Sequence, residues 1–464
     1  MSAPIIWIIF PFACAVVLWF LQDDQRLSVL LGAGCCIVLA FFALVLPIGG
    51  AISFGSFSIA ILPTLNILGR QLVIESGDRY IVVLIYAMSA FWFLGTLSAK
   101  AHRLFISSSL GIIALLVAAL SVSPFLYAAL LIEMAVLLSI PMMLQPGKPM
   151  GAGVLRYLIF QTLGMPIILI AGWVLDVLST NPTSQTLMTL AAAFLGLGLA
   201  FWLAVFPFYS WVPLLSGDTH PYVAGFMLWA LPTSVLLLIL DFLDGFTWLR
   251  QEALLYVALQ IVGVVMVASG GIWAAFQRKL TRLFGYAVII ETGFSLLALS
   301  QFPTLGLDNY AMILFPRLVA LAVWSLSMSI LSQQGVALDL DGIQQLFYRA
   351  PVAATALCVS IFSVAGFPLL AGFPLRLSIV QQLAQNSLLS AIWALVGTFG
   401  FLFASFRILV STVAGGREAE RIPEKPLAIF FLVVGTLIMI GVGIWPHLFL
   451  SGLPAILQPF PGLL

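Results

Sequence analysis

The sequence predicts an all-α polytopic membrane protein, and two observations carry this prediction. Hydrophobic residues make up 62% of the 464 positions, charged residues make up only 8%, and the mean hydropathy is +1.18. Apolar residues also run on for about 20 positions at a time, the length that an α-helix needs to cross the hydrocarbon core of a bilayer. Because these runs are continuous and do not alternate with polar residues, they exclude a transmembrane β-barrel.

A count of the apolar runs gives about fourteen helical spans. The spans cover residues 5–21, 27–48, 80–98, 104–121, 125–144, 157–176, 187–206, 222–242, 254–276, 283–300, 310–331, 351–371, 387–409 and 426–446. Residues 49–77 are mixed in character and contain Pro and Gly, so we expect an external loop with some helical content. The tail after Trp445-Pro446 is short and apolar, and no part of the sequence resembles a separate soluble domain.

Several kinds of ligand are not expected. The net charge of +1, without a basic arm, gives no indication of nucleic-acid binding. The four cysteines lie inside apolar runs without CxxC spacing, so we expect no disulfide framework and no zinc or iron–sulfur site. The sequence also lacks a phosphate-binding Walker loop and a dinucleotide-binding glycine pattern. We therefore expect no metal and no cofactor bound to this chain.

Basic residues predict the orientation, because cytoplasmic loops of membrane proteins are enriched in Lys and Arg. Thirteen of the 18 basic residues lie in or beside loops that follow odd-numbered spans: Arg26, Lys100, Arg103, Lys148, Arg156, Arg278, Lys279, Arg282, Arg349, Arg407, Arg417, Arg421 and Lys425. Only Arg70, Arg79, Arg250 and Arg376 follow even-numbered spans. Odd-numbered loops are therefore predicted to be cytoplasmic, with both termini on the outer face of the cell membrane.

Proline interrupts two of the spans. Span seven ends at Pro207 and Pro213, and span twelve contains Pro368 and Pro374 together with Gly366 and Gly372. Proline removes a backbone donor and clashes with the preceding helical turn, so each site should be a helix break. Two broken helices five spans apart are typical of transporters built from inverted repeats. This predicts helices 1–3 with the external loop in residues 1–103, a first five-helix repeat in 104–252, a second in 253–410, and a last helix with its tail in 411–464.

Four ionisable residues lie deep in apolar spans. Glu133 has no other charge between Arg103 and Lys148, Glu291 and Arg317 lie in spans ten and eleven, and Arg376 follows the proline cluster of span twelve. A charge in the bilayer interior costs several kcal/mol on most scales, so such a residue is a functional hypothesis by default. An unpaired buried charge would be expensive, so we expect Glu291 and Arg317 within salt-bridge reach of each other or of another intramembrane ion.

Five segments resemble the antiporter-like membrane subunits of respiratory complex I, in the order found in that family. Residues 206–226 (FPFYSWVPLLSGDTHPYVAGF) are similar to the family segment PFHxWLPDAHxxAPxxVSAFL, and residues 279–293 (KLTRLFGYAVIIETG) to DLKRLLAYSSIAHMG. Residues 366–376 (GFPLLAGFPLR) resemble GIPPLAGFFxKF, while 156–164 and 399–405 resemble neighbouring helices of the family. The related subunits of multi-subunit cation/proton antiporters and membrane-bound hydrogenases share this pattern.

The resemblance implies a proton path along a polar axis halfway through the membrane. On this axis Glu133 keeps the family's helix-five carboxylate, but Trp202 and Thr233 replace its lysines on helices seven and eight. Glu291 stands at a histidine position, Arg317 at a histidine site on helix eleven, and Arg376 at the ion of helix twelve. Asp218 and His220 fall at the family's DAH position, where they would help gather protons at the cytoplasmic mouth or stabilise the loop. Arginine stays protonated, so Arg317 and Arg376 cannot relay protons as a lysine does.

Two functions remain open on this resemblance. The chain is either a subunit that translocates protons or cations, driven by remote redox chemistry in a complex I-type or antiporter assembly, or a structural subunit that has lost conduction. In both cases its partners are other membrane subunits and lipids, and quinone and NADH act only through the complex.

The orientation can be tested by cysteine labelling. Cysteines introduced at positions 148 and 417 should react with an impermeant reagent only from the cytoplasmic side, because both positions follow odd-numbered spans. Labelling of both from the outside would contradict the predicted orientation.

Overall fold

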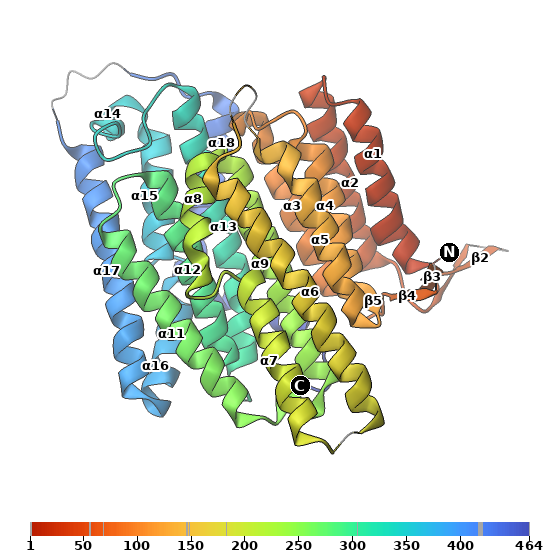
Figure 1. Ribbon diagram of the computed structural model, residues 1–464. Coiled ribbons are helices and arrows are strands. Elements are labelled where there is room, and N and C mark those ends of the chain that lie inside the picture. The colour runs from red at the N-terminus through yellow and green to blue at the C-terminus, as the bar shows by residue number, and fades with distance from the viewer. Residues whose placement is uncertain are drawn as a thin grey trace.

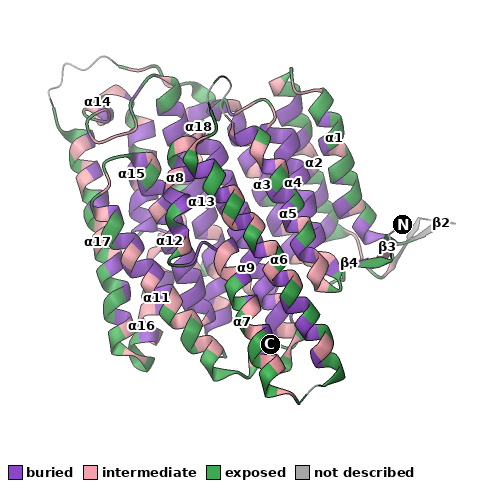
Figure 2. Cartoon of the chain, in the orientation of Figure 1, coloured by how far each residue is buried: buried purple, intermediate pink, exposed green. Residues whose placement is uncertain are grey.

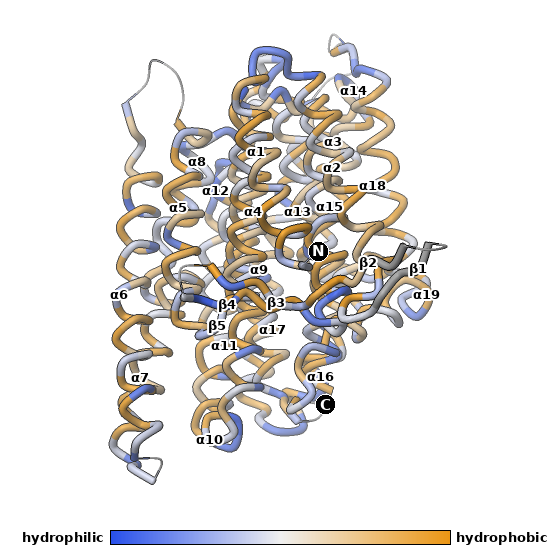
Figure 3. The backbone as a smooth tube through the Cα atoms, turned by 90° about the vertical axis from the view of Figure 1, so that its right-hand side faces the viewer, coloured by the Kyte–Doolittle hydropathy of each residue, from blue (hydrophilic) through white to orange (hydrophobic). Residues whose placement is uncertain are grey.

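Helices form nearly all of the chain in a computed structural model that describes residues 2–54, 57–67, 69–144, 147, 149–181, 183–303, 305–415 and 421–463. Lys148 and Arg417 lie outside the described residues. Eleven of the described helices are long and apolar enough to cross a membrane. Figure 3 shows apolar residues along the helices and hydrophilic stretches gathered at their ends.

Each of the fourteen ranges predicted from the sequence overlaps a helix. The first half contains α1 (Phe10–Phe20, preceded by a π-helical turn at Ile5–Ile9), α2 (Gln25–Val45), α3 (Arg79–Ala99), α4 (Phe105–Ser121), α5 (Ala128–Met143, preceded by a 3-10 turn at Phe125–Tyr127), α6 (Ala152–Thr180), α7 (Gln185–Trp202), α8 (Trp211–Asp218, preceded by a 3-10 turn at Phe208–Ser210), α9 (Pro221–Gly245) and α10 (Thr247–Arg250). The second half contains α11 (Ala253–Ala275), α12 (Leu280–Leu299), α13 (Gly306–Gln333), α14 (Leu346–Arg349), α15 (Pro351–Val364), α16 (Phe373–Asn386), α17 (Leu388–Val413), α18 (Pro426–Ile444), α19 (Pro446–Leu450) and a 3-10 turn at Leu453–Leu457.

The core lies along three long helices. Nearly every residue of α9, α12 and α13 is buried, whereas α1, α2, α7, α11 and α17 turn an exposed apolar face outward (Figure 2). A helix that is apolar all round belongs in the interior, and in a membrane protein an apolar outer face is what lipid contacts. Buried polar residues on α9, α12 and α13 and on their immediate neighbours are therefore the strongest candidates for a functional site.

The predicted helical content of residues 49–77 is wrong. Four short strands lie there, β1 (Ala51–Phe54), β2 (Phe57–Ala60), β3 (Thr64–Ile67) and β4 (Arg70–Val73), and β4 also pairs with β5 (Val122–Ser123) (Figure 1). β1 pairs with β2, and the second sheet has the antiparallel order β3-β4-β5. Polar and apolar residues alternate along Thr64–Ile67 and over the last three residues of Ala51–Phe54, the period of a strand. Glycine and proline between these runs favour turns, and this combination was the signal for hairpins.

Both proline-bearing spans are broken, and the two breaks have the same backbone hydrogen bonds. After α7, the N–H of Ala204 donates to Phe201 O at 3.3 Å and that of Val205 to Ala200 O at 2.9 Å. After α15, the N–H of Gly366 donates to Ser363 O at 3.1 Å and that of Phe367 to Phe362 O at 3.0 Å. Ala204 and Gly366 both have positive φ, at 52° and 70°. Each helix therefore ends in a left-handed residue with the paired hydrogen bonds of a Schellman motif.

Glycines bring α11 and α17 into backbone contact. A Cβ atom added at Gly271 would lie 1.8 Å from the carbonyl oxygen of Gly397, and one added at Gly397 would lie 2.1 Å from that of Val267. Small residues of this kind let helices in a membrane approach closely. The contact joins the first helix of the second half to the second helix after its break.

Gly271→Ala is expected to lower the free energy of unfolding by about 1–3 kcal/mol, because the added methyl group forces the two backbones apart. The measurement is the thermal unfolding midpoint of the purified protein in detergent. Gly196→Ala on α7 is the matched control, because nothing lies within 4 Å of the Cβ it would gain. An equal midpoint for the two variants would contradict the close-contact interpretation.

Candidate intramembrane ion site

Glu133 on α5 faces α6 and is only partly satisfied. Its side chain is 8% exposed, and its Oε1 accepts a hydrogen bond from the Thr162 hydroxyl at 2.8 Å. Its Oε2 has no hydrogen-bond partner among the described residues. A buried carboxylate with one donor is poorly compensated, because each oxygen can accept more than one hydrogen bond. The second oxygen of Glu133 is therefore available to a further hydrogen-bond donor.

Trp202, at the end of α7, holds the break against α6. Its indole N–H donates to Gln161 O at 3.1 Å, and the Gln161 amide donates back to Trp202 O at 3.2 Å. The ring also packs against Gly164, where an added Cβ would lie 2.4 Å from the indole nitrogen. An indole nitrogen donates hydrogen bonds and does not accept them, so Trp202 cannot take the place of a lysine as a proton carrier. Gln161 and Thr162 were not singled out from the sequence, although both are polar residues in an apolar run.

Thr233 lies in the middle of α9, the most buried of the helices. It is 4% exposed, and its hydroxyl has no partner among the described residues. Pro232 precedes it and removes the N–H that would bond to Leu228 O. The Thr233 hydroxyl and the carbonyl oxygen of Leu228 are therefore polar groups in an otherwise apolar helix, which lies between the two halves of the chain.

Glu291 and Arg376 form a buried ion pair between α12 and α16. The Arg376 Nη2 lies 2.6 Å from Glu291 Oε1, and both side chains are 5% exposed. The guanidinium carbon lies 4.4 Å above the ring centre of Phe294, a distance at which a cation is attracted to the π-face. Arg376 is the fourth residue of α16, so the break after α15 brings this cation into the interior.

Glycine at the break leaves room for this pair. A Cβ at Gly366 would lie 2.9 Å from Arg376 Cδ, and one at Gly372 would lie 2.1 Å from Ser363 O. The glycines of the predicted break thus allow the Arg376 side chain to pass close to the backbone.

Arg317 on α13 is not the partner of Glu291, contrary to the first expectation from the sequence. Its Nη2 donates to the Thr292 hydroxyl at 3.2 Å, whereas Glu291 takes the alternative intramembrane partner, Arg376. Adjacent residues of a helix project about 100° apart, so Glu291 and Thr292 face different neighbours of α12. Arg317 is 1% exposed, and its Nε and Nη1 have no partner among the described residues.

Asp218 and His220 lie together at the end of α8, as the sequence predicts, but they have different environments. Asp218 Oδ2 accepts from the N–H of Gly153 at 2.7 Å and so caps the start of α6. His220 Nε2 lies 3.2 Å from the Ser329 hydroxyl and lines a cavity of about 470 Å³ that also contains Lys100 and His102. Burial, with a smaller contribution from His102, lowers the pKa of His220 to about 4. His220 is therefore neutral at pH 7.

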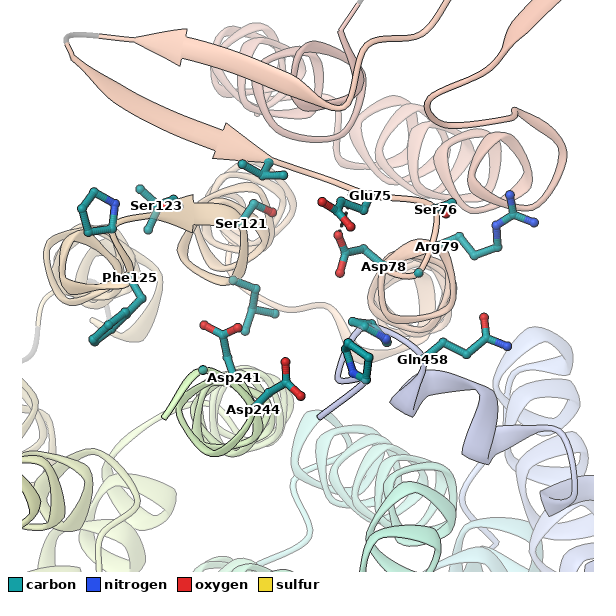
Figure 4. A pocket seen from close by; sticks show the side chains of 18 of the residues that line it. Glu75, Ser76, Asp78, Arg79, Ser121, Ser123, Phe125, Asp241, Asp244 and Gln458 are labelled. Atoms are coloured by element: carbon teal, nitrogen blue, oxygen red, sulfur yellow. Dashed lines mark hydrogen bonds between the residues drawn. The ribbon is translucent and has the colours of Figure 1, made fainter. Parts of the chain in front are cut away.

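A second, larger cavity of about 1090 Å³ was not predicted from the sequence. Figure 4 shows Glu75 and Asp78, just before α3, and Asp241 and Asp244, near the end of α9, turned toward it. The pKa of Asp78 is raised to about 6, mainly by burial; a hydrogen bond from the Glu75 N–H opposes this rise, and the nearby Glu75 carboxylate adds a smaller one. A narrow extension leads inward from Asp78 and Asp241 between α3, α4 and α9. Asp241 lies on the wall of this cavity, near the end of α9.

Removing one member of the buried ion pair should destabilise the protein more than removing both. Arg376→Met leaves the Glu291 carboxylate without its counter-ion and is expected to cost about 3–5 kcal/mol. The double variant Arg376→Met with Glu291→Gln should recover most of that loss, because no buried charge of the pair remains. Thermal unfolding midpoints of the four proteins of this cycle measure the coupling. Additive losses would show that the 2.6 Å contact contributes no pairing energy.

Comparison with known proteins identifies the family to which these features belong. Residues 157–403 match the family model described as "NADH:quinone oxidoreductase/Mrp antiporter, TM". NADH-quinone oxidoreductase subunit N 1 of Koribacter versatilis is 28% identical over 267 residues, which cover 54% of this chain and 51% of that protein. NADH-quinone oxidoreductase subunit N of Methylococcus capsulatus is 27% identical over 288 residues, which cover 60% and 57%. The chain thus spans about half the length of the curated relatives it matches.

Solved structures show the same fold over almost the whole chain. A chain of the Mrp complex from Dietzia sp. superposes with a TM-score of 0.81 at 15% identity and covers 99% of this chain and 98% of that one. A chain of respiratory complex I from Thermus thermophilus gives a TM-score of 0.71 at 18% identity and covers 96% and 99%. The family match extends over more than half of the 464 residues and includes both broken helices and three of the four buried ions. The chain is a multi-pass membrane protein and belongs to the NADH:quinone oxidoreductase/Mrp antiporter transmembrane family.

Proposed function

We propose that this chain is an antiporter-like subunit that translocates protons across the membrane within a complex I-type or related assembly. The observation that carries the proposal is Glu133, a buried carboxylate with one hydrogen-bond donor and one unpartnered oxygen. A residue that relays protons must be able to change its protonation state, and an acid held by one neutral hydroxyl meets this condition better than one fixed by a cation. Family membership supports the proposal.

The path would run from Glu133 by water past Thr233 to Glu291. Thr233 offers a hydroxyl without a protein partner midway along the chain, on the helix that separates the two halves. Arg376 would keep a permanent positive charge beside Glu291 at the far end of the path, because arginine does not release its proton. The two cavities, with His220 at one and Asp78 at the other, would provide the aqueous entrances.

The two breaks support an inverted-repeat organisation. We propose that residues 104–252 and 253–410 superpose after inversion, with the break after α7 equivalent to that after α15. Their matching hydrogen bonds and left-handed residues support this. We also propose that both termini lie on the outer face of an inner or cytoplasmic membrane, on the strength of the basic loops. Other membrane subunits and lipids are the proposed partners, while quinone and NADH act only elsewhere in the complex.

One observation favours a second function, a non-conducting structural subunit. Glu291 is held at 2.6 Å by an arginine, and Trp202 fills the position where the family carries a lysine. A fixed ion pair and an indole stabilise the interior but carry no protons. On this alternative Glu133 would be a remnant of an ancestral path.

Glu133→Gln separates the two functions. Glutamine keeps the size and the hydrogen bond to Thr162 but cannot ionise, so the assembled complex should form normally and lose proton translocation through this subunit. The measurement is coupled proton uptake into vesicles that contain the intact assembly, with subunit content checked by immunoblot. Asp176→Asn on the exposed face of α6 is the matched control and should translocate protons as the wild type does. Full coupled translocation by Glu133→Gln would leave the structural function in its place.

A further inference from the structure

The buried charges of the second half do not balance. Arg317 and Arg376 are 1% and 4% exposed, and Glu291 is the buried carboxylate that the described residues place beside them. Glu291 is held by Arg376 at 2.6 Å, which leaves the Arg317 guanidinium with the neutral Thr292 hydroxyl as its hydrogen-bond partner. The cluster therefore carries one positive charge in excess. An unpaired charge in a low-dielectric interior costs several kcal/mol, so a counter-ion is strongly favoured.

The hydrogen-bond inventory around Arg317 points to the same conclusion. Its Nε and Nη1 both have N–H groups without an acceptor among the described residues, although the side chain is buried. Guanidinium nitrogens only donate, so the missing group must be an acceptor. The neighbouring Thr292 hydroxyl already donates to Val288 O at 2.9 Å and accepts from Arg317.

Tyr310 adds a further donor on the same face of α13. It precedes Arg317 by seven residues, close to two helical turns, and side chains of a helix lean toward its N-terminus, so the Arg317 side chain extends toward Tyr310. Arg317 interacts electrostatically with Glu291, although it makes no ion pair with it, and more weakly with Tyr310. Tyr310 is 0% exposed, and its hydroxyl also lacks a partner among the described residues.

We propose that Arg317 and Tyr310 bind a small monovalent inorganic anion, of which chloride is the biological example, inside the membrane. The anion would accept from the Arg317 Nε–H and Nη1–H and from the Tyr310 O–H, and it would neutralise the excess positive charge beside the Glu291–Arg376 pair. This site goes beyond proton translocation: it is a bound counter-ion, and its occupancy does not depend on whether the subunit conducts.

Bromide retention tests the site directly, because bromide resembles chloride in size and charge and has a low background. The full-length chain is purified in bromide, exchanged into gluconate and denatured, and the released bromide is measured by ion chromatography. The wild type should retain about one bromide per chain, as charge neutralisation of the cluster requires. Arg317→Gln should retain none. Arg278→Gln is the control, because Arg278 is an exposed arginine, 72% accessible, in a loop ion pair.

Tyr310→Phe provides the second variant, since it keeps the guanidinium and removes one donor. It should weaken bromide binding about tenfold or more, the effect of one hydrogen bond to a charged group. The binding is read from the rise of the unfolding midpoint with bromide at constant ionic strength. Absence of bromide from the wild type, which is the result expected if water occupies the position, would overturn the proposal. Equal retention by Arg317→Gln, or wild-type affinity in Tyr310→Phe, would equally remove the assigned ligands.

Discussion

The ion pair between Glu291 and Arg376 is the contact on which the second half of the molecule depends. It joins an unbroken helix, α12, to the short helix α16 that begins after a break, and it lies where water is excluded. In such an environment neither ion is tolerated without the other. The break, the glycines that let the Arg376 side chain pass and the carboxylate on α12 therefore form one unit. A helix without the break would not bring Arg376 to this depth at the start of α16.

The first half has the same kind of break but a different content. There two adjacent residues of α6 make the contacts: Gln161 donates a hydrogen bond to the end of α7, and Thr162 donates one to Glu133. One helix therefore stabilises both the break and the carboxylate. No arginine enters from this break, and a tryptophan closes it. Glu133 is consequently held by a neutral hydroxyl, whereas Glu291 is held by a permanent cation. The two breaks thus share their backbone hydrogen bonds and differ in the side chain that each brings into the interior.

Much of the fold follows from the sequence because the bilayer imposes a simple rule. Every long apolar run overlaps a helix, since an unpaired backbone group in lipid is too costly. The proline and glycine clusters at Pro207 and Gly366 correctly indicated the breaks for the same reason. The strands between Ala51 and Val73 were missed because they lie outside the long apolar runs, where only a short alternation of residues indicates them. Helix prediction was reliable for the long apolar runs and failed for residues 49–77 and for α16, where polar residues interrupt the apolar pattern.

The partner of a buried ion is harder to predict than its presence. The sequence placed Glu291, Arg317 and Arg376 in the interior, but a difference of one residue along α12 decides which arginine reaches the carboxylate and which reaches Thr292. That choice depends on how α13 and α16 pack against α12, which is a property of the tertiary structure. This packing also decides the charge of the interior, because Arg317, which makes no ion pair with a carboxylate, adds an excess positive charge. On the other side of α9, Glu133 has no cation among its described contacts. Glu133 and Arg317 are thus opposite charges that lie on either side of the apolar helix α9 without a counter-ion of their own. A proton bound at Glu133, or an anion bound at Arg317, would lower the electrostatic cost of the interior. The hydroxyl of Thr233 lies on α9, between the two.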